Sequence, residues 1–192
     1  MQQGELTERP LVFVDIETTG GSPTSSRVLE LAAIRVEGGK IVSTINTLID
    51  AGEPVPPFIT SLTGIREGDQ WGAPSFQSIA DKLADLLAGG YFVAHNVAFD
   101  YSFIAAEYQR LDRALTTPRL CTVKLSRRLY PQYQSHRLAA VIDRHNITVH
   151  KRHRAYDDAL ALVEFVKLAE GEHGVSAVRS AWSAQLPKSL AF

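Results

Sequence analysis

Short apolar runs separated by turn-forming residues predict four strands, which lie mostly in the first quarter of the chain. Each run is rich in β-branched residues and is bounded by glycine, proline or polar residues. The predicted strands cover residues 11–16, 28–36, 40–49 and 91–94. Gly38 and Gly39 separate the second run from the third, which predicts a hairpin. Residues 50–57 contain three prolines and are predicted to form a loop.

Apolar residues spaced three and four apart predict helices in the rest of the chain. The clearest case is residues 75–88, where Ser75 is a suitable N-cap and Gly89 ends the pattern. Further helices are predicted at residues 97–111, 122–129, 136–145 and 154–170. Strands come first, and helices and strands then alternate. This order predicts an α/β fold with a mixed sheet flanked by helices.

Composition narrows the class of protein. The 192 residues are 45% hydrophobic, which is typical of a globular domain and argues against disorder. Cys121 is the only cysteine, so a disulfide within the chain and a cysteine-built zinc site are both excluded. No apolar run is long enough to span a membrane and no signal peptide is evident, so we expect a cytoplasmic protein. The net charge of −1 means that any affinity for nucleic acid must come from a local patch.

Two carboxylates stand at the end of the first predicted strand. In "LVFVDIETTGG" Asp15 and Glu17 are two apart, so a strand places both side chains on one face. Buried carboxylates repel each other and lose hydration, and they are therefore expected to hold a cation between them. Taken alone, the motif also fits a strand end in solvent, where each charge is hydrated.

Two further carboxylates fall on the apolar faces of predicted helices. Asp100, in "AHNVAFDYSF", shares a face with Phe103 and Ile104. In "HKRHRAYDDALALVEF" Asp158 aligns with the apolar stripe, whereas its neighbour Asp157 aligns with a more polar face. Asp158 is therefore predicted to point inward and Asp157 to be solvated.

A histidine accompanies these carboxylates. His153 lies five residues before Asp158, too far around a helix to share its face, and is therefore predicted in the loop before that helix. Hard oxygen ligands without cysteine favour Mg²⁺ or Mn²⁺, and two such ions can clamp both oxygens of a phosphodiester that is being cleaved. A histidine that titrates near neutral pH could deprotonate the attacking water.

The segments DIETTG, HNVAFD and HRAYDD, in this order, resemble the three motifs of the DEDDh (DnaQ-like) 3′-to-5′ exonucleases. This superfamily includes the proofreading subunit of bacterial DNA polymerase III. The resemblance covers residues 11 to about 170 and implies a ribonuclease-H-like fold with a five-stranded mixed sheet. It also implies hydrolysis from the 3′ end with release of nucleoside monophosphates.

The resemblance assigns roles to the residues of the three motifs. Asp15, Glu17 and Asp158 would hold the catalytic metal ion, and Asp15 would bridge to a second ion that Asp100 supports. His153 would be the general base. Arg154 stands where the tyrosine branch of the superfamily has its tyrosine, so the chain is similar to the histidine branch.

The resemblance also implies contacts to the nucleotide at the 3′ end. These residues are Ile16, Thr18, Thr19, Leu62, Thr63, Asn96 and Phe99. A histidine that the proofreading subunit places in the segment "SLTGI" is missing here, so the terminal base could be handled differently. Phe99 fits core packing as well as a wall of the site.

The expected domains follow from the same comparison. We expect a flexible arm at residues 1–10, an exonuclease domain at residues 11–175, and a C-terminal helix and tail at residues 176–192. The tail "QLPKSLAF" resembles a segment that binds a sliding clamp, although Pro187 replaces the usual glutamine. A frayed terminus or a linker to a further domain are the alternatives.

The substrate is expected to be the single-stranded 3′ end of DNA, with a polymerase or sliding clamp as a possible partner and no membrane contact. An RNA-trimming enzyme of the same fold, similar to RNase T, is the first alternative, and a catalytically inactive nucleic-acid-binding module is the second. The basic stretch "HKRHR" at residues 150–154 fits a phosphate-attracting rim or an ordinary solvated loop. Arg127, Arg128 and Arg137 would extend such a rim if they shared its face.

Overall fold

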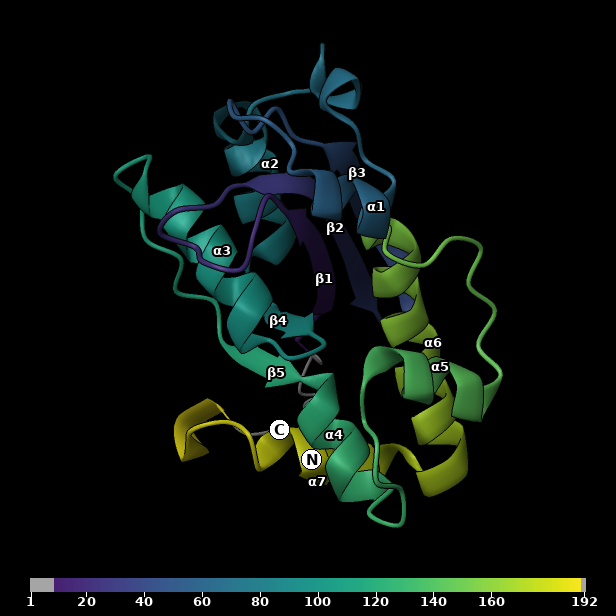
Figure 1. Ribbon diagram of the computed structural model, residues 1–192. Coiled ribbons are helices and arrows are strands. Elements are labelled where there is room, and N and C mark those ends of the chain that lie inside the picture. Colours follow the sequence, from purple (N-terminus) through teal and green to yellow (C-terminus); the bar gives the residue numbers. More distant parts are fainter. Residues whose placement is uncertain (1–8, 191–192) are drawn as a thin grey trace.

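A computed structural model describes residues 9–190 (Figure 1). The predicted arm at residues 1–10 and the end of the predicted clamp-binding tail therefore lie largely outside the described residues. The strands are β1 Leu11–Thr18, β2 Val28–Glu37, β3 Lys40–Leu48, β4 Tyr91–Ala94 and β5 Arg119–Cys121. The α-helices are α1 Pro57–Thr63, α2 Phe76–Leu87, α3 Ala98–Gln109, α4 Thr122–Leu129, α5 Leu138–His145, α6 Ala155–His173 and α7 Val175–Ser183. Short 3₁₀ helices form at Glu67–Gln70 and Lys188–Leu190.

The five strands form one mixed sheet in the order β3-β2-β1-β4-β5. Strand β2 is antiparallel to both β1 and β3, as the predicted hairpin requires, whereas β1, β4 and β5 run parallel. The carboxyl ends of β1 and β4 therefore meet at the same edge of the sheet. The predicted α/β class and the five-stranded mixed sheet are confirmed.

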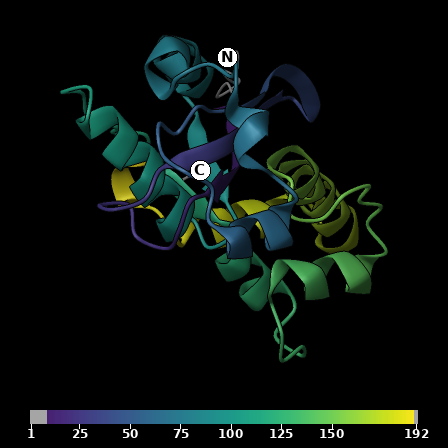
Figure 2. The ribbon, with the colours of Figure 1, turned by 45° about the horizontal axis from the view of Figure 1, so that its top comes forward.

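Helices cover both faces of the sheet. Figures 1 and 2 both show α3 on one side of the central strands and α6 on the other. Strand β1 alternates accordingly: Val12, Val14 and Ile16 pack with residues of α2 and α3, whereas Phe13 packs with residues of α6. The alternation puts Asp15 and Glu17 on the α6 face, as side chains two and four residues after Phe13.

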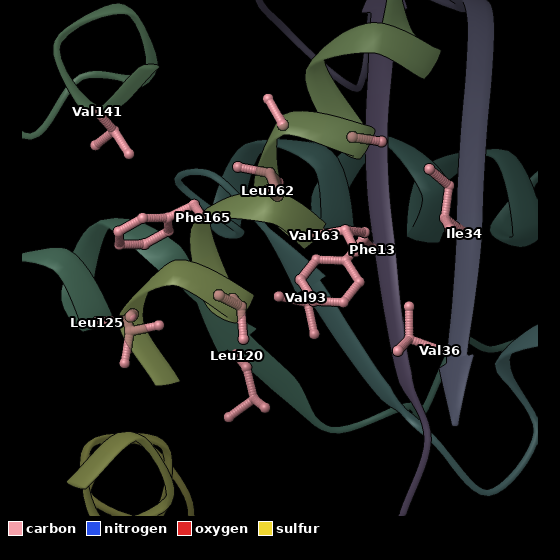
Figure 3. Packing of buried hydrophobic residues seen from close by; sticks show 14 of the residues in the cluster. Phe13, Ile34, Val36, Val93, Leu120, Leu125, Val141, Leu162, Val163 and Phe165 are labelled. Carbon is pink, nitrogen blue, oxygen red and sulfur yellow. The ribbon is translucent and has the colours of Figure 1, made fainter. Parts of the chain in front are cut away.

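The core on the α6 face is built from large apolar side chains. Figure 3 shows Phe13 of β1 and Ile34 of β2 facing Leu162 and Val163 of α6, with Phe165 reaching toward Leu125 of α4. This packing fixes α6, and with it the first turn of that helix, against the end of the sheet where the acidic residues lie.

A register shift interrupts the pairing of β1 with β2. Glu17 pairs with Glu30, but Thr18 pairs with Val28, so Leu29 is the extra residue of a bulge. Leu29 is fully buried and belongs to a small separate cluster with Ile59 of α1. The bulge thus joins the end of β1 to the segment that carries α1.

The sequence patterns located most elements and missed several short ones. Helix α4 occupies the predicted residues 122–129, and the other elements predicted from patterns agree to within about three residues at each end. Helix α1, both 3₁₀ helices and the three-residue strand β5 were not predicted, and α7 was expected only as a C-terminal helix within residues 176–192. Among residues 9–190, no helix has the length and apolar character needed to cross a membrane.

We expect Leu162→Ala to destabilise the protein by about 2–5 kcal/mol, because the substitution leaves a cavity in the tightly packed core beneath α6. Leu168→Ala on the same helix is the matched control, since that side chain is exposed and its loss should change stability by about 0.5 kcal/mol or less. Urea unfolding of both variants measures the difference. Equal losses of stability would contradict the packing described for α6.

Candidate active site

Asp15 and Glu17 mark the carboxyl end of β1 on the face that α6 covers. Both side chains are partly buried, and the bulge after Glu17 ends the regular pairing immediately beyond them. Asp158 approaches from the opposite side, in the first turn of α6. Carboxylate oxygens of Asp15, Glu17 and Asp158 all lie within 4.8 Å of one another, in the described part of the chain.

Neighbouring aspartates in α6 differ in burial. Asp158 is 5% exposed, whereas Asp157 is only partly buried and does not belong to the carboxylate cluster. The helical alignment predicted from the sequence, with Asp158 facing inward, is thus confirmed by the burial of these two residues.

Asp100 reaches the same end of the sheet from another element. It lies in the first turn of α3, is 4% exposed, and has the backbone of Ile16 in β1 near its carboxylate. Among the neighbouring charges, the charge of Asp100 raises the pKa of Asp15 the most. The structure therefore brings all four predicted carboxylates together, with Asp100 beside Asp15 and outside the tighter group of three.

Burial and mutual repulsion raise the pKa values of these carboxyl groups. The pKa of Asp15 is raised well above its ordinary value by burial and then by the charges of Asp100, Asp158 and Glu17. Burial, followed by the charges of Asp158 and Glu30, raises the pKa of Glu17 to about 7. Burial also raises the pKa of Asp100 to about 8. Without a cation, the folded protein therefore holds protons at this site near neutral pH.

The donor set suits a divalent cation. Each of the clustered carboxylates offers hard oxygen atoms, which Mg²⁺ and Mn²⁺ prefer, and a cation would relieve the repulsion that raises the pKa values. Asp15, Glu17 and Asp158 are the residues that would hold it.

His153 lies in the loop before α6, as the sequence predicted. Helix α6 begins at Ala155, and the His153 side chain is exposed. Its backbone has a φ of +56°, a left-handed conformation that is uncommon for residues other than glycine. Burial raises the pKa of Asp158, and Arg152 and then His153 oppose that rise, so His153 lies near the Asp158 carboxylate.

Arg152 forms an ion pair inside the site. Its Nε lies 3.0 Å from Oδ1 of Asp158, and its charge partly offsets the rise that burial causes in the pKa of Asp158. In the basic stretch at residues 150–154, one cation therefore faces the acidic cluster instead of bulk solvent.

A second ion pair, between Glu30 and Arg154, fixes the same loop. Glu30 of β2 is 2% exposed and accepts hydrogen bonds from Nε of Arg154 at 2.9 Å and from its second terminal nitrogen at 2.6 Å. The backbone N–H of Ala155 donates to the same carboxylate at 3.0 Å. Glu30 thereby anchors the start of α6 to the sheet, directly opposite Glu17.

Sequence reasoning missed Glu30, although a signal for it was present. Glu30 is the one acidic residue within the apolar segment VLELAAIRV, at a position that faces the interior. A buried carboxylate in such a strand requires a partner. Arg154, which the sequence patterns assigned to a basic rim or solvated loop and to the position that excludes the tyrosine branch, is that partner.

The residues expected to contact the terminal nucleotide divide into two groups. The hydroxyls of Thr18 and Thr63 donate to backbone carbonyls at 2.7 and 2.9 Å, and the Thr19 hydroxyl donates to the carboxylate of Glu53. These three threonines and Ile16 are buried. Leu62, Asn96 and Phe99 form the second group. Leu62 is 51% exposed on α1, Asn96 is exposed with a φ of +66°, and Phe99 is partly buried against Phe103 with ring centroids 4.9 Å apart.

The sequence matches the RNase T family of exonucleases over residues 12–166. The PolC-type DNA polymerase III of Caldanaerobacter subterraneus subsp. tengcongensis is 35% identical over 164 residues, which are 85% of this chain and 12% of that polymerase. The corresponding protein of Streptococcus mutans is 33% identical over 177 residues, covering 90% of this chain and 12% of the relative. The chain therefore spans only a small part of the length of these relatives.

Solved structures show the same fold at lower identity. Exonuclease X in complex with 5′ overhanging duplex DNA superposes with a TM-score of 0.71 at 23% identity, over 87% of this chain and 95% of that one. E. coli Exonuclease I in complex with a dA16 oligonucleotide gives a TM-score of 0.77 at 18% identity, over 90% of this chain and 43% of that one.

These likenesses agree with the ribonuclease-H-like sheet and with the resemblance seen in the three sequence motifs. The family match, which covers most of the chain, and the polymerase relatives above 30% identity together show that this chain belongs to the RNase T (DnaQ-like) family of exonucleases.

Proposed function

We propose that this chain hydrolyses phosphodiester bonds from the 3′ end of single-stranded or frayed DNA and releases nucleoside 5′-monophosphates. The observation that carries this proposal is the group of three carboxylates within 4.8 Å of one another at the end of β1. The match to the RNase T family supports the reaction class, and the PolC-type polymerase relatives favour DNA as the substrate.

Two divalent cations, Mg²⁺ or Mn²⁺, complete the proposed site. When bound, such ions stabilise negative charge on the attacking and leaving oxygens of the phosphate. Asp15, Glu17 and Asp158 would hold one ion, and Asp15 with Asp100 would hold the other. Arg152 pairs with Asp158, and its guanidinium would be available to a substrate phosphate if that carboxylate held a metal ion.

His153 is the proposed general base. Its exposed imidazole stands beside Asp158, where it can take a proton from the attacking water on an unprotonated ring nitrogen. The ion pair between Glu30 and Arg154 holds the backbone on the far side of His153 and so limits where the imidazole can reach.

The exposed residues near the site would contact the terminal nucleotide. Leu62 on α1 and Asn96 after β4 present side chains to solvent, and Phe99 supplies a partly buried aromatic wall. Ile16, Thr18, Thr19 and Thr63 would act through backbone groups or by shaping this surface, because their side chains are buried.

The polymerase relatives suggest that the chain works together with a DNA polymerase. The sliding-clamp segment and the division into arm, domain and tail remain predictions from the sequence. An RNA-trimming activity is the second candidate, since the matched family carries the name RNase T.

A 5′-labelled single-stranded DNA tests the function directly. We expect a ladder that shortens from the 3′ end with Mg²⁺ or Mn²⁺ and stops with a chelator. Asp158→Asn should abolish the ladder because it removes a ligand, whereas Asp157→Asn should retain most of the activity because Asp157 lies outside the cluster. An RNA of the same sequence, tested in parallel, decides between the two substrates. No cleavage of either polymer would favour an inactive binding module instead.

His153→Ala should lower turnover by about 10²–10⁴-fold at saturating metal, the usual contribution of a general base. Circular dichroism and metal titration of the variant control for its folding and metal site. A variant with wild-type turnover would remove His153 from the mechanism.

The metal-free protein should lose stability as pH rises from about 4 to 8. The pKa of Glu17 is about 7 and that of Asp100 about 8 in the folded state, both above the values of an unfolded chain, so the folded state binds more protons across this window. Stability conferred by those protons is lost as they dissociate. Adding Mn²⁺ should therefore raise the melting temperature more at pH 8 than at pH 5. Scanning fluorimetry measures both effects, and a metal-induced shift of equal size at the two pH values would argue against this acidic site.

A further inference from the structure

A cavity of about 610 Å³ lies between α4 and the segment that leads into α5. Figure 1 shows these two green segments next to each other, below β4. One wall is α4, with Lys124 and Arg127, and the other is the segment before α5, with His136 and Arg137. The end of the cavity nearest β4 is formed by His95 and Asn96, in the turn that follows β4, together with the end of β5.

The cavity is lined by lysine and arginine side chains and by no described carboxylate. Lys124, Arg127 and Arg137 are exposed, and within residues 9–190 none of them forms an ion pair with a carboxylate. None of the described residues that line the cavity is acidic. In a chain whose net charge is −1, this is a local concentration of unneutralised positive charge.

The two walls are held together by partly buried hydrogen bonds. His95 bridges them, with Nδ1 2.9 Å from the Thr122 hydroxyl at the start of α4 and Nε2 2.9 Å from the backbone carbonyl of His136. A carbonyl oxygen only accepts, so Nε2 carries the proton and Nδ1 accepts. Burial lowers the pKa of His95 to about 4, and this bridge is therefore made by a neutral imidazole at physiological pH.

A second set of hydrogen bonds joins α4 to His136 and to α5. The Ser126 hydroxyl of α4 lies 2.8 Å from Nδ1 of His136 and accepts a hydrogen bond from Arg144 of α5 at 3.1 Å. Thr122 and Ser126 are fully buried. The cavity is therefore preformed, so little conformational entropy would be lost in ordering its walls when a ligand binds.

Two features relate the cavity to the candidate active site. Asn96 lines it and belongs to the turn that leads into the helix bearing Asp100. Arg152, which pairs with Asp158, lies close enough to His95 to lower its pKa. A strand whose 3′ end reaches the carboxylates therefore has a path of positive charge next to it.

We propose that this basic cavity binds the sugar-phosphate backbone of single-stranded nucleic acid, on the 5′ side of the bond that is cleaved. The inference rests on the proposed function, because that function fixes which end of the strand occupies the carboxylate cluster. Arginine guanidinium groups bind phosphate oxygens in pairs of hydrogen bonds, and cations along a groove give contacts that depend on salt and not on sequence. DNA and RNA share this backbone chemistry, so the cavity adds affinity for long strands without choosing between them.

The structure supplies a matched pair of variants. Arg127→Ala/Arg137→Ala removes one cation from each wall, whereas Arg128→Ala removes the next residue of α4, which is exposed and does not line the cavity. Neither change touches the partly buried hydrogen bonds of Thr122, Ser126 or His136.

Binding is measured first, with a labelled single-stranded DNA and a chelator present so that no cleavage occurs. We expect Arg127→Ala/Arg137→Ala to bind roughly tenfold more weakly and to lower the slope of log affinity against log salt by about 0.7 for each lost contact. Arg128→Ala should match the wild type. Competition with an RNA of the same sequence should show a similar loss for the paired variant, as expected for contacts to the backbone.

Measurements of hydrolysis distinguish a failure of this proposal from a failure of the proposed function. For the paired variant, KM on a long oligonucleotide should rise with little change in kcat, and the preference for the long strand over a dinucleotide should shrink. If Arg127→Ala/Arg137→Ala binds and cleaves long strands as Arg128→Ala does, the cavity is not the path of the strand, even though the exonuclease is active. If the wild type cleaves nothing but the paired variant still loses affinity, the proposed function fails and the binding surface stands.

Discussion

Mutual repulsion among buried carboxylates is the constraint on which the rest of this structure depends. Asp15, Glu17, Asp100 and Asp158 meet where β1 ends. Burial raises the pKa values of all four, and the charges of neighbouring carboxylates add to the rise for Asp15, Glu17 and Asp100. A fold can keep these carboxylates close together only if cations neutralise them or some of them remain protonated. The chain supplies Arg152 directly to Asp158, and a divalent cation fits the remaining demand. The sheet, the bulge and the first turns of α3 and α6 position these charges.

The two arginines beside His153 serve different parts of this arrangement. Arg152 points into the acidic cluster, whereas Arg154 is committed to Glu30 and fastens the start of α6 to β2. A loop that carries an exposed histidine is thereby fixed on both sides of that residue. The exposure of His153 is compatible with a defined position, since the backbone around it is anchored by buried partners.

The sequence was most informative where one strong periodicity controlled the structure. Alternation placed Asp15 and Glu17 on one face, and helical spacing separated the buried Asp158 from Asp157. Strand β5 was missed because three residues are too few to show a period, and α1 because it starts at Pro57 in a segment whose prolines favour a loop. Contacts between distant segments were also out of reach. The pairing of Glu30 with Arg154 joins residues 124 positions apart, and the meeting of Arg127 with Arg137 at one cavity depends on the fold that His95 bridges.

The bulge in β2 has a consequence for how this domain can vary. Leu29 turns into the small cluster beneath α1, while its neighbour Glu30 turns toward the acidic cluster and α6. Two adjacent residues thus connect the α1 surface, which bears Leu62, to the carboxylates. Inserting or deleting a residue at this point would shift both surfaces together, so the distance between the α1 surface and the carboxylates depends on this one point in β2. Changes to the α1 surface are therefore expected through its side chains, and not through the length of the strand that carries Glu30.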